Sequence, residues 1–367
     1  MNWFDIQNIN EIDSPTLVIY LDRVQRNIDK VIKIAGNVTR LRPHVKTHKT
    51  PQIVDLHLQK GIDKFKCATI AEAEMCARQG AKSIILAHQL TIPKYNRWIK
   101  LIQTFPNTEF IAVVDNQLII NDLEALSKAN NLVLKLLIDV NNGMNRSGIR
   151  LNDSAFELCQ KIDKSKYLNF GGLHVYDGHI RQSNFAERQQ NGEKDFQKVT
   201  DFAARLKQAN IKVDEIVVGG SPSFPVHANR PNVTLSPGTY VFWDKGYGDK
   251  CQELDFEHAA LMITRVISVI DEQTVCLDLG HKSIASENPH PRVYFLNCEV
   301  EKFLIHSEEH LTIQTPDAKH LKVGDVLYGI PHHICPTVNL TDELTVIENG
   351  KATQRWEVVA RKRKLTI

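Results

Sequence analysis

Short apolar segments alternate with longer amphipathic stretches over more than half of this 367-residue chain, and this alternation limits the folds that it can adopt. The apolar segments are rich in Val, Ile and Leu, as is typical of strands that are buried on both faces. Eight of them occur, at residues 38–41, 65–68, 83–87, 110–114, 132–140, 169–175, 215–218 and 235–242. Eight strand–helix alternations predict an α/β fold with a closed (β/α)8 barrel of the TIM type. An open doubly wound sheet is the main alternative.

The stretches between these segments predict helices. Thr69-Ile-Ala-Glu72 has the pattern of a capping box, and Gly80 is a residue at which that helix can end. Residues 115–129 and 183–209 are further helical stretches.

The character of the chain changes after about residue 256, where strand-like segments are separated by turn residues and helical periodicity is weak. These segments are residues 261–269, 274–279, 293–300, 311–314 and 326–329. We therefore expect a barrel domain at residues 21–250 and a separate β domain at residues 251–367. Residues 1–20 contain the strand-like segment 16–20, which is compatible with packing against either domain, the β domain included.

Composition excludes several classes of protein. The 45 basic residues are balanced by 43 acidic ones, which argues against nucleic acid or an anionic membrane as the main partner. The first ten residues lack a basic segment, so we expect no secretory signal, and no apolar run of about 18 residues predicts a membrane helix. Seven scattered cysteines without a C-x-x-C pair indicate a reduced, cytoplasmic chain.

The segment Arg42-Pro-His-Val-Lys46-Thr-His-Lys49 ends the first predicted barrel strand. Residues at the carboxyl ends of barrel strands face the active site. Because only a neutral amine attacks an aldehyde, a lysine that is partly desolvated there suits imine formation. His44 and His48 are candidates for hydrogen bonding and proton relay. The alternative is a basic turn that is simply solvated.

This segment resembles the R-P-H-x-K-x-H-K signature of the D-threonine aldolase and D-serine dehydratase family, which are pyridoxal-phosphate enzymes of the alanine racemase fold. The resemblance implies that Lys46 carries pyridoxal 5'-phosphate and that Lys49 is its neighbour. It also implies a barrel followed by a β domain, and a homodimer.

Two further segments carry the resemblance. Asp139-Val-Asn-Asn-Gly-Met-Asn-Arg146-Ser-Gly resembles the D-x-G-M-x-R-x-G segment of alanine racemases, which implies that Arg146 binds the cofactor's phenolic oxygen. Tyr176-Asp-Gly-His179 resembles the family motif Y-x-G-H. It implies a cofactor contact for Tyr176, and His179 is a candidate general base. Without the resemblance, these segments would be interpreted as a glycine-rich turn and a loop histidine.

The loops after the seventh and eighth predicted strands are candidates for phosphate binding, as in many barrels. Gly220 and Gly238 allow backbone N–H groups to approach a phosphate, and the hydroxyls of Ser221, Ser223 or Thr239 can add bonds. The resemblance adds Tyr240 to this cofactor set. Alanine racemases have R-P-G where this chain has Ser236-Pro-Gly, and their arginine limits the basicity of the pyridine nitrogen. This departure favours lyase over racemase chemistry.

His333 and Cys335 are spaced two apart, so on an extended segment they would project to the same side. Imidazole and thiolate suit zinc, with manganese or magnesium as other possibilities, and the two residues match the family's H-x-C metal pair. Two protein ligands leave positions for water and substrate, as an open catalytic site requires. The alternative is a buried free cysteine beside a hydrogen-bonded histidine.

Together these features predict a pyridoxal-phosphate- and divalent-metal-dependent lyase that acts on small β-hydroxy-D-amino acids. Cysteine as the second ligand resembles the dehydratase members more than the aspartate-bearing aldolases, which favours β-elimination slightly over aldol cleavage. The alternatives are a metal-independent amino-acid racemase, a non-catalytic pyridoxal-phosphate-binding protein and a metal-binding scaffold without cofactor.

Overall fold

Seven parallel strands form one sheet in chain order in the computed structural model, which describes residues 2–367. They are β2 (Lys64–Cys67), β3 (Ser83–Leu86), β4 (Glu109–Val114), β5 (Leu134–Asp139), β6 (Leu168–Val175), β7 (Glu215–Val218) and β8 (Thr234–Leu235). Residues 41–44 lie between the first and last of them, because Leu41 pairs with Leu235 and His44 pairs with Lys66, both in parallel. This arrangement confirms the predicted (β/α)8 barrel class. Residues 41–44 occupy the position of the eighth strand, but they form only isolated bridges.

The bounds of two predicted strands are wrong. Residues 38–41 begin as a 3-10 helix, Val38–Arg40, because the Asn37 side chain accepts a hydrogen bond from the N–H of Thr39. The predicted strand at residues 235–242 ends at Leu235, and the chain turns into a 3-10 helix at Thr239–Val241. Pro237 lies between, and it has no N–H for a sheet ladder.

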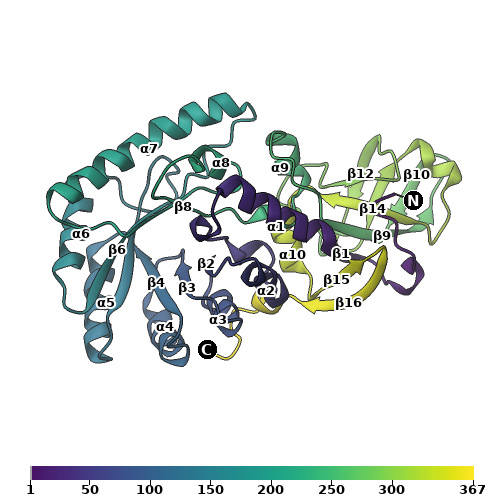
Figure 1. Cartoon of the computed structure of the whole chain (residues 1–367). Coiled ribbons are helices and arrows are strands. Elements are labelled where there is room, and N and C mark those ends of the chain that lie inside the picture. The colour runs from purple at the N-terminus through teal and green to yellow at the C-terminus, as the bar shows by residue number, and fades with distance from the viewer. Residues whose placement is uncertain (1) are drawn as a thin grey trace. The chain divides into compact units, whose positions relative to one another are not determined.

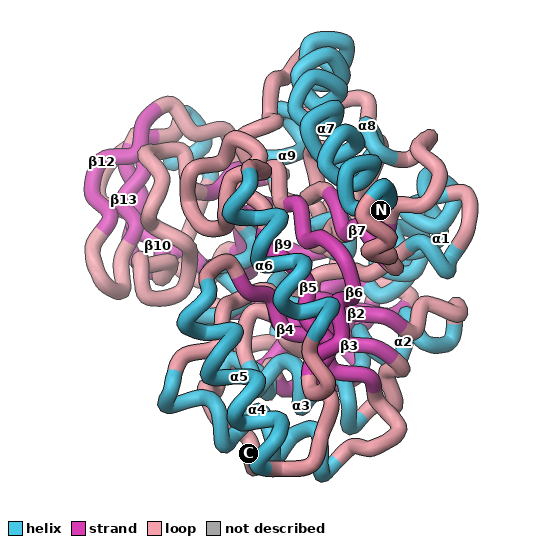
Figure 2. The backbone as a smooth tube through the Cα atoms, turned by 90° about the vertical axis from the view of Figure 1, so that its left-hand side faces the viewer, coloured by secondary structure: helices cyan, strands magenta, loops and turns pink. Residues whose placement is uncertain are grey.

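Helices follow most of these strands. They are α2 (Pro51–Gln59), α3 (Ile70–Arg78), α4 (Ile92–Thr104), α5 (Gln117–Ala129), α6 (Asp153–Lys164), α7 (Phe185–Gln208) and α8 (Phe224–His227). Figures 1 and 2 show α4, α5 and α6 on the outside of the sheet. The predicted cap at Thr69 is confirmed, since its hydroxyl accepts a hydrogen bond from the N–H of Glu72 at 3.1 Å. Apolar side chains from β3, β4, β5 and β7 form a buried core cluster, namely Ile85, Ile111, Val113, Leu137 and Val217.

A second, nine-stranded sheet is built mainly from the C-terminal third of the chain. Its strands are β1 (Thr16–Tyr20), β9 (Ala260–Val269), β10 (Thr274–Leu277), β11 (Val293–Phe295), β12 (Lys302–His306), β13 (Leu311–Gln314), β14 (Val326–Pro331), β15 (Glu343–Glu348) and β16 (Lys351–Glu357). The main path runs β12-β13-β10-β9-β1-β15-β16, and β14 pairs with β9 and β11. Strand β1 belongs to this sheet, because it pairs antiparallel with β9 and parallel with β15.

Contacts divide the chain into two units. Unit 1 contains the described residues up to Lys30, Thr47–Thr50 and Thr239–Arg361, and therefore holds the nine-stranded sheet. Unit 2 contains Val31–Lys46, Pro51–Gly238 and Lys362–Ile367, and holds the barrel.

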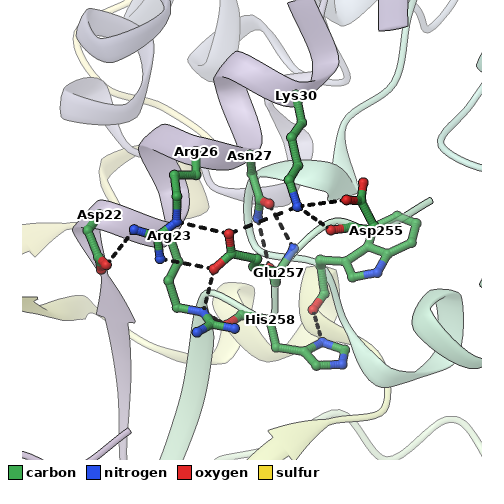
Figure 3. Close-up of polar contacts among 9 residues, drawn as sticks. Asp22, Arg23, Arg26, Asn27, Lys30, Asp255, Glu257 and His258 are labelled. Carbon is green, nitrogen blue, oxygen red and sulfur yellow. Dashed lines mark hydrogen bonds and ion pairs between the residues drawn. The ribbon is translucent and has the colours of Figure 1, made fainter. Parts of the chain in front are cut away.

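In unit 1, the first part of α1 (Leu21–Ala35) is bound to residues 255–258, which precede β9 (Figure 3). The Arg26 guanidinium donates two hydrogen bonds of 2.9 Å to the carboxylate of Glu257. Asn27 donates to the backbone oxygen of Glu257 at 2.8 Å. This network joins the helix to the sheet's first long strand.

All seven cysteines lie among the described residues, and none of them forms a disulfide. Among residues 2–367, none of the helices combines the length and the apolar character that crossing a membrane requires.

Candidate active site

Lys46 lies two residues after the segment 41–44, which closes the barrel sheet. It lies in a 3-10 turn, Val45–Thr47, and its side chain is exposed, whereas the flanking Val45 and Thr47 are buried. Its backbone N–H donates to Nδ1 of His44 at 3.3 Å. The sequence prediction that Lys46 emerges at the end of a barrel strand therefore agrees with its position in unit 2.

The loop after β5 presents Arg146. Gly148 has φ +91°, and a Cβ atom there would lie 2.7 Å from the backbone nitrogen of Asn141, so only glycine fits where the loop folds back. The guanidinium carbon of Arg146 lies 4.6 Å from the ring centroid of Tyr176, a cation–π contact.

Tyr176 connects three segments of unit 2. A Cβ atom at Gly220 would lie 3.1 Å from Cε2 of the Tyr176 ring, so the loop after β7 passes close against this ring. The ammonium nitrogen of Lys66, on β2, lies 5.7 Å from the same ring centroid. The structure thus brings together Tyr176, Arg146 and Gly220, which the sequence singled out, and adds Lys66.

A buried chain of hydrogen bonds holds the loop after β7. The Asp177 carboxylate accepts from Oγ of Ser223 at 2.5 Å and from Nε2 of His227 at 2.7 Å. The Ser223 hydroxyl in turn accepts from the N–H of Gly220 at 3.0 Å. The Ser223 hydroxyl, one of three hydroxyls considered for phosphate binding, is therefore bound to Asp177.

The loops after β7 and β8 meet through Ser221, whose hydroxyl accepts from the N–H of Gly238 at 3.3 Å. Ser236 is buried, and its hydroxyl donates to the backbone oxygen of Arg42 at 2.7 Å. Gly220, Ser221 and Gly238 of the predicted phosphate loops thus lie together in unit 2.

His179 lies against the arginine loop. Its Nε2 atom is 2.8 Å from Oδ2 of Asp195, and its buried Nδ1 atom has no partner among the described residues. A Cβ atom at Gly143 would lie 2.6 Å from Nε2 of His179, so this imidazole requires glycine at that position.

Two buried polar residues of unit 2, His174 and Lys66, escaped sequence reasoning. Nδ1 of His174 is 2.8 Å from Oδ1 of Asp139, and burial lowers the pKa of His174 despite this bond. Burial lowers the pKa of Lys66 to about 7, and the nearby charge of Lys46 adds to this effect. Lys66 was detectable in the sequence as a charge within an apolar strand run.

The proposed metal pair lies in unit 1. The prediction of an extended segment is wrong, because His333 is the N-cap of α10 (Ile334–Leu340) and Cys335 lies in its first turn. The Asp244 carboxylate accepts from the N–H of Ile334 at 3.0 Å, which favours helix formation there. Burial raises the pKa of Asp244 to about 6.

The side chains of His333 and Cys335 nevertheless meet. They share a hydrogen bond, which contributes to raising the pKa of His333 to about 9 against the lowering effect of burial. Nδ1 of His333 lies 2.5 Å from Oε1 of Glu287. Within residues 2–367, no cluster of three or more His, Cys, Asp and Glu side chains has the geometry of a metal site.

Thr239 and Tyr240 also belong to unit 1. The Thr239 hydroxyl lies 3.8 Å from Sγ of Cys335. Tyr240 is fully buried, which raises its pKa, and its ring centroid lies 5.8 Å from that of Phe256.

Comparison with known families agrees with this architecture. Residues 19–245 match the family model described as alanine racemase, N-terminal domain. The chain belongs to this alanine racemase family. Residues 259–347 match a second model, described as a putative serine dehydratase domain.

Relatives of this alanine racemase-family chain are named as lyases. The 3-hydroxy-D-aspartate aldolase of Paracoccus denitrificans (strain Pd 1222) is 27% identical over 364 residues, which cover 96% of this chain and 93% of that protein. This confirms the resemblance to the D-threonine aldolase and D-serine dehydratase family.

Two solved structures confirm the fold. D-threonine aldolase from Filomicrobium marinum has a TM-score of 0.87 at 24% identity, covering 96% of both chains. D-threo-3-hydroxyaspartate dehydratase from Delftia sp. HT23 has a TM-score of 0.81 at 21% identity, covering 94% of this chain and 97% of that chain. A variant of D-threo-3-hydroxyaspartate dehydratase with one cysteine replaced by alanine was solved in a metal-free form.

Proposed function

We propose that the protein is a pyridoxal-phosphate-dependent lyase that acts on β-hydroxy-D-amino acids, with a divalent metal held by His333 and Cys335. The observation that carries the proposal is the contact of Tyr176 with both Arg146 and the Gly220 loop, in the unit from which Lys46 projects. Pyridoxal phosphate needs an amine to bind its aldehyde, a guanidinium to hold its phenolate, and glycine-rich loops to bind its phosphate.

The residues of unit 2 fit the cofactor. Lys46 would bind its aldehyde carbon covalently, Arg146 would hold its phenolate oxygen, and the loops with Ser221 and Gly238 would bind its phosphate. Buried polar atoms without partners among the described residues, Oδ1 of Asn142 and Nε2 of His174, support a polar ligand in this unit. The chemistry supplied by bound pyridoxal phosphate is the withdrawal of negative charge from the substrate Cα.

The metal pair fits an open site. Because Glu287 holds Nδ1 of His333, Nε2 is left as the ligand atom, as is usual for histidines that bind metals. Thiolate and imidazole favour zinc. The chemistry supplied by the bound ion is Lewis-acid activation of the substrate's β-oxygen.

The protein's own residues then have separate roles. The Lys46 amine takes the α-proton in an elimination. His179 is suited to act as a base, because Nε2–H donated to Asp195 leaves the Nδ1 lone pair available. In an aldol cleavage, His179 would take the proton of the β-hydroxyl.

Two reactions share these groups. We favour β-elimination because the proposed second metal ligand is a cysteine, and the match of residues 259–347 to a model described as a putative serine dehydratase domain supports this choice. Aldol cleavage is the second candidate, supported by the full-length similarity to a 3-hydroxy-D-aspartate aldolase.

The test is product analysis with D-threonine, pyridoxal phosphate and zinc, with and without a chelator. Elimination yields 2-oxobutanoate and ammonia, whereas aldol cleavage yields glycine and acetaldehyde. Chelation should stop either reaction. Epimerisation of D-threonine that resists chelation would contradict the lyase proposal, and retention of the visible absorbance by Lys46→Ala would contradict the role of Lys46.

A further inference from the structure

Lys66 is a buried lysine inside the barrel unit. Its side chain is on β2 and only 3% of the residue is exposed. Its backbone N–H donates to the carbonyl of Pro43 at 2.9 Å, so it lies directly beside the segment that leads to Lys46. Lysine is almost never buried to this extent unless it has a charged or functional partner.

The carboxylates near Lys66 are already bonded elsewhere. Asp139 is bound by His174, and Asp177 is bound by Ser223 and His227. Both carboxylates attract the Lys66 ammonium, but neither compensates for its burial, because the pKa of Lys66 still falls to about 7.

Two other cationic groups, Lys46 and Arg146, lie near enough to Lys66 to repel its ammonium. The ammonium of Lys66 and the guanidinium of Arg146 face the same Tyr176 ring, at 5.7 and 4.6 Å from its centroid. The charges of Lys46 and Arg146 both act on Lys66 unfavourably. Lys46 and Arg146 are exposed, whereas Lys66 is buried, so their repulsion is least screened at Lys66, and an anion bound beside its ammonium would offset that repulsion.

His174 gives a second, independent indication of a ligand. The residue is 4% exposed, and the Nε2 atom of its imidazole has no partner among the described residues. The charges of Lys66 and Arg146 act on it. A buried polar atom without a partner calls for a polar group or an ordered water nearby.

We propose that Lys66 is a second cationic contact for the anion that binds beside Arg146, and therefore a cofactor-positioning residue in addition to Lys46 and Arg146. The inference rests on the proposed function, in which that anion is the phenolate of pyridoxal phosphate. An anion beside the ammonium favours its charged form, so binding should be coupled to proton uptake by Lys66. The other ionisable groups around it are Lys46, Arg146, Asp139, His174, Tyr176 and Asp177.

The experiment is titration of the cofactor-free protein with pyridoxal 5'-phosphate between pH 6 and 10. Affinity is read from the visible absorbance, and proton uptake from calorimetry in two buffers with different ionisation heats. Lys66→Met removes the charge and keeps the chain length, whereas Lys66→Arg keeps a charge that does not titrate. Lys64→Met is the matched control, because Lys64 lies on the same strand and points to the backbone oxygen of Thr39.

We expect Lys66→Met to bind roughly 10- to 100-fold more weakly near pH 8, as for loss of a charged hydrogen bond. Cofactor binding to Lys66→Met should be accompanied by less proton uptake than binding to the wild type. The difference in cofactor affinity between the two proteins should vanish near pH 10. Lys66→Arg should retain the affinity without the extra proton uptake. Lys64→Met should match the wild type.

The outcomes separate the two proposals. The wild type could develop visible absorbance while Lys66→Met keeps the wild-type affinity and proton uptake. That outcome would overturn the role of Lys66 alone. Absence of visible absorbance in the wild type would overturn the proposed function together with this inference. Thermal unfolding of the cofactor-free variants verifies that each is folded, and a folded Lys66→Arg keeps the test decisive if Lys66→Met does not fold.

Discussion

The hydroxyl of Thr47 lies 3.2 Å from the thiol of Cys335, so the residue that follows Lys46 in the sequence contacts one member of the proposed metal pair. The Thr239 hydroxyl approaches the same thiol at 3.8 Å. Two hydroxyls therefore hold the orientation of Cys335 within unit 1.

Replacing Cys335 by alanine should remove the metal and leave the cofactor. A two-residue site that loses its thiolate keeps one imidazole, which is too few protein ligands for tight zinc binding. Zinc content measured after dialysis should fall to background, while the visible absorbance of the cofactor stays. The control is Cys276→Ala, since Cys276 is a buried thiol on β10. Stoichiometric zinc in Cys335→Ala would contradict the metal assignment.

Replacing Glu287 by glutamine should weaken metal binding without abolishing it. The Glu287 carboxylate fixes Nδ1 of His333 at 2.5 Å, and loss of such an outer partner typically costs about 10- to 100-fold in metal affinity. Competition with a zinc-binding dye measures the change. Glu343→Gln is the control, because Glu343 forms an exposed ion pair with Arg355. Equal affinities in both variants would mean that Glu287 does not orient the ligand.

The fold was predictable where the pattern of apolar residues in the sequence matches the burial of the strand that forms. Residues 110–114 form a continuous apolar run and residues 311–314 alternate Leu and Ile with Thr and Gln; both were identified as strands, and they match β4 and β13 closely. Strand β16 was missed because its sequence, KATQRWE, is polar and mostly exposed, and pairing with β15 decides its conformation. Such tertiary pairing leaves no local signal.

The site was predictable where a motif keeps its residues adjacent in sequence. Lys46, Arg146 and Tyr176 lie in short motifs, and the structure places all three in unit 2. The bond between Asp177 and His227 joins residues 50 positions apart, so only the folded chain reveals it. Lys66 has no motif, and its burial is the property that marks it.

Replacing Asp177 by asparagine should loosen the loop after β7. The carboxylate accepts hydrogen bonds from Ser223 and His227 in a buried place, and loss of such bonds costs roughly 1–3 kcal/mol of unfolding free energy. Because Ser223 also holds the N–H of Gly220, cofactor affinity should fall as well. Urea denaturation and cofactor titration measure both effects. Lower stability with unchanged cofactor affinity would contradict the positioning role, and Ser223→Ala should give a smaller effect of the same kind.

Replacing Gly143 by alanine should displace the Arg146 loop. The position has φ +137°, and the new Cβ atom would lie 2.6 Å from Nε2 of His179. Gly36→Ala is the matched control, because Gly36 also has a positive φ (+73°) but has open space around it. Backbone strain of about 1 kcal/mol is common to both, so only Gly143→Ala should also weaken cofactor binding. Equal cofactor affinity in the two variants would show that the loop tolerates the methyl group.

Replacing Lys66 by methionine should change how stability depends on pH in the cofactor-free protein. The pKa of Lys66 is lowered from 10.5 to about 7 in the folded state, first by burial and then by the charge of Lys46. Between these two pH values the unfolded chain holds a proton that the folded protein has lost, so the stability of the wild type rises with pH through this window. Below pH 7 both states carry the charge, and the wild type bears the full cost of burying it.

The difference in unfolding free energy between Lys66→Met and the wild type isolates this effect, because other titrating groups are common to both proteins. Lys66→Met should be the more stable protein at pH 7, since it buries an apolar chain of similar length in place of an ammonium group. Its advantage should shrink as the pH rises from 7 to 10, at a rate that approaches about 1.4 kcal/mol per pH unit. Urea denaturation at several pH values measures it. Parallel stability curves for the two proteins would mean that Lys66 titrates at its ordinary pKa in the folded state, and burial would then not control its charge.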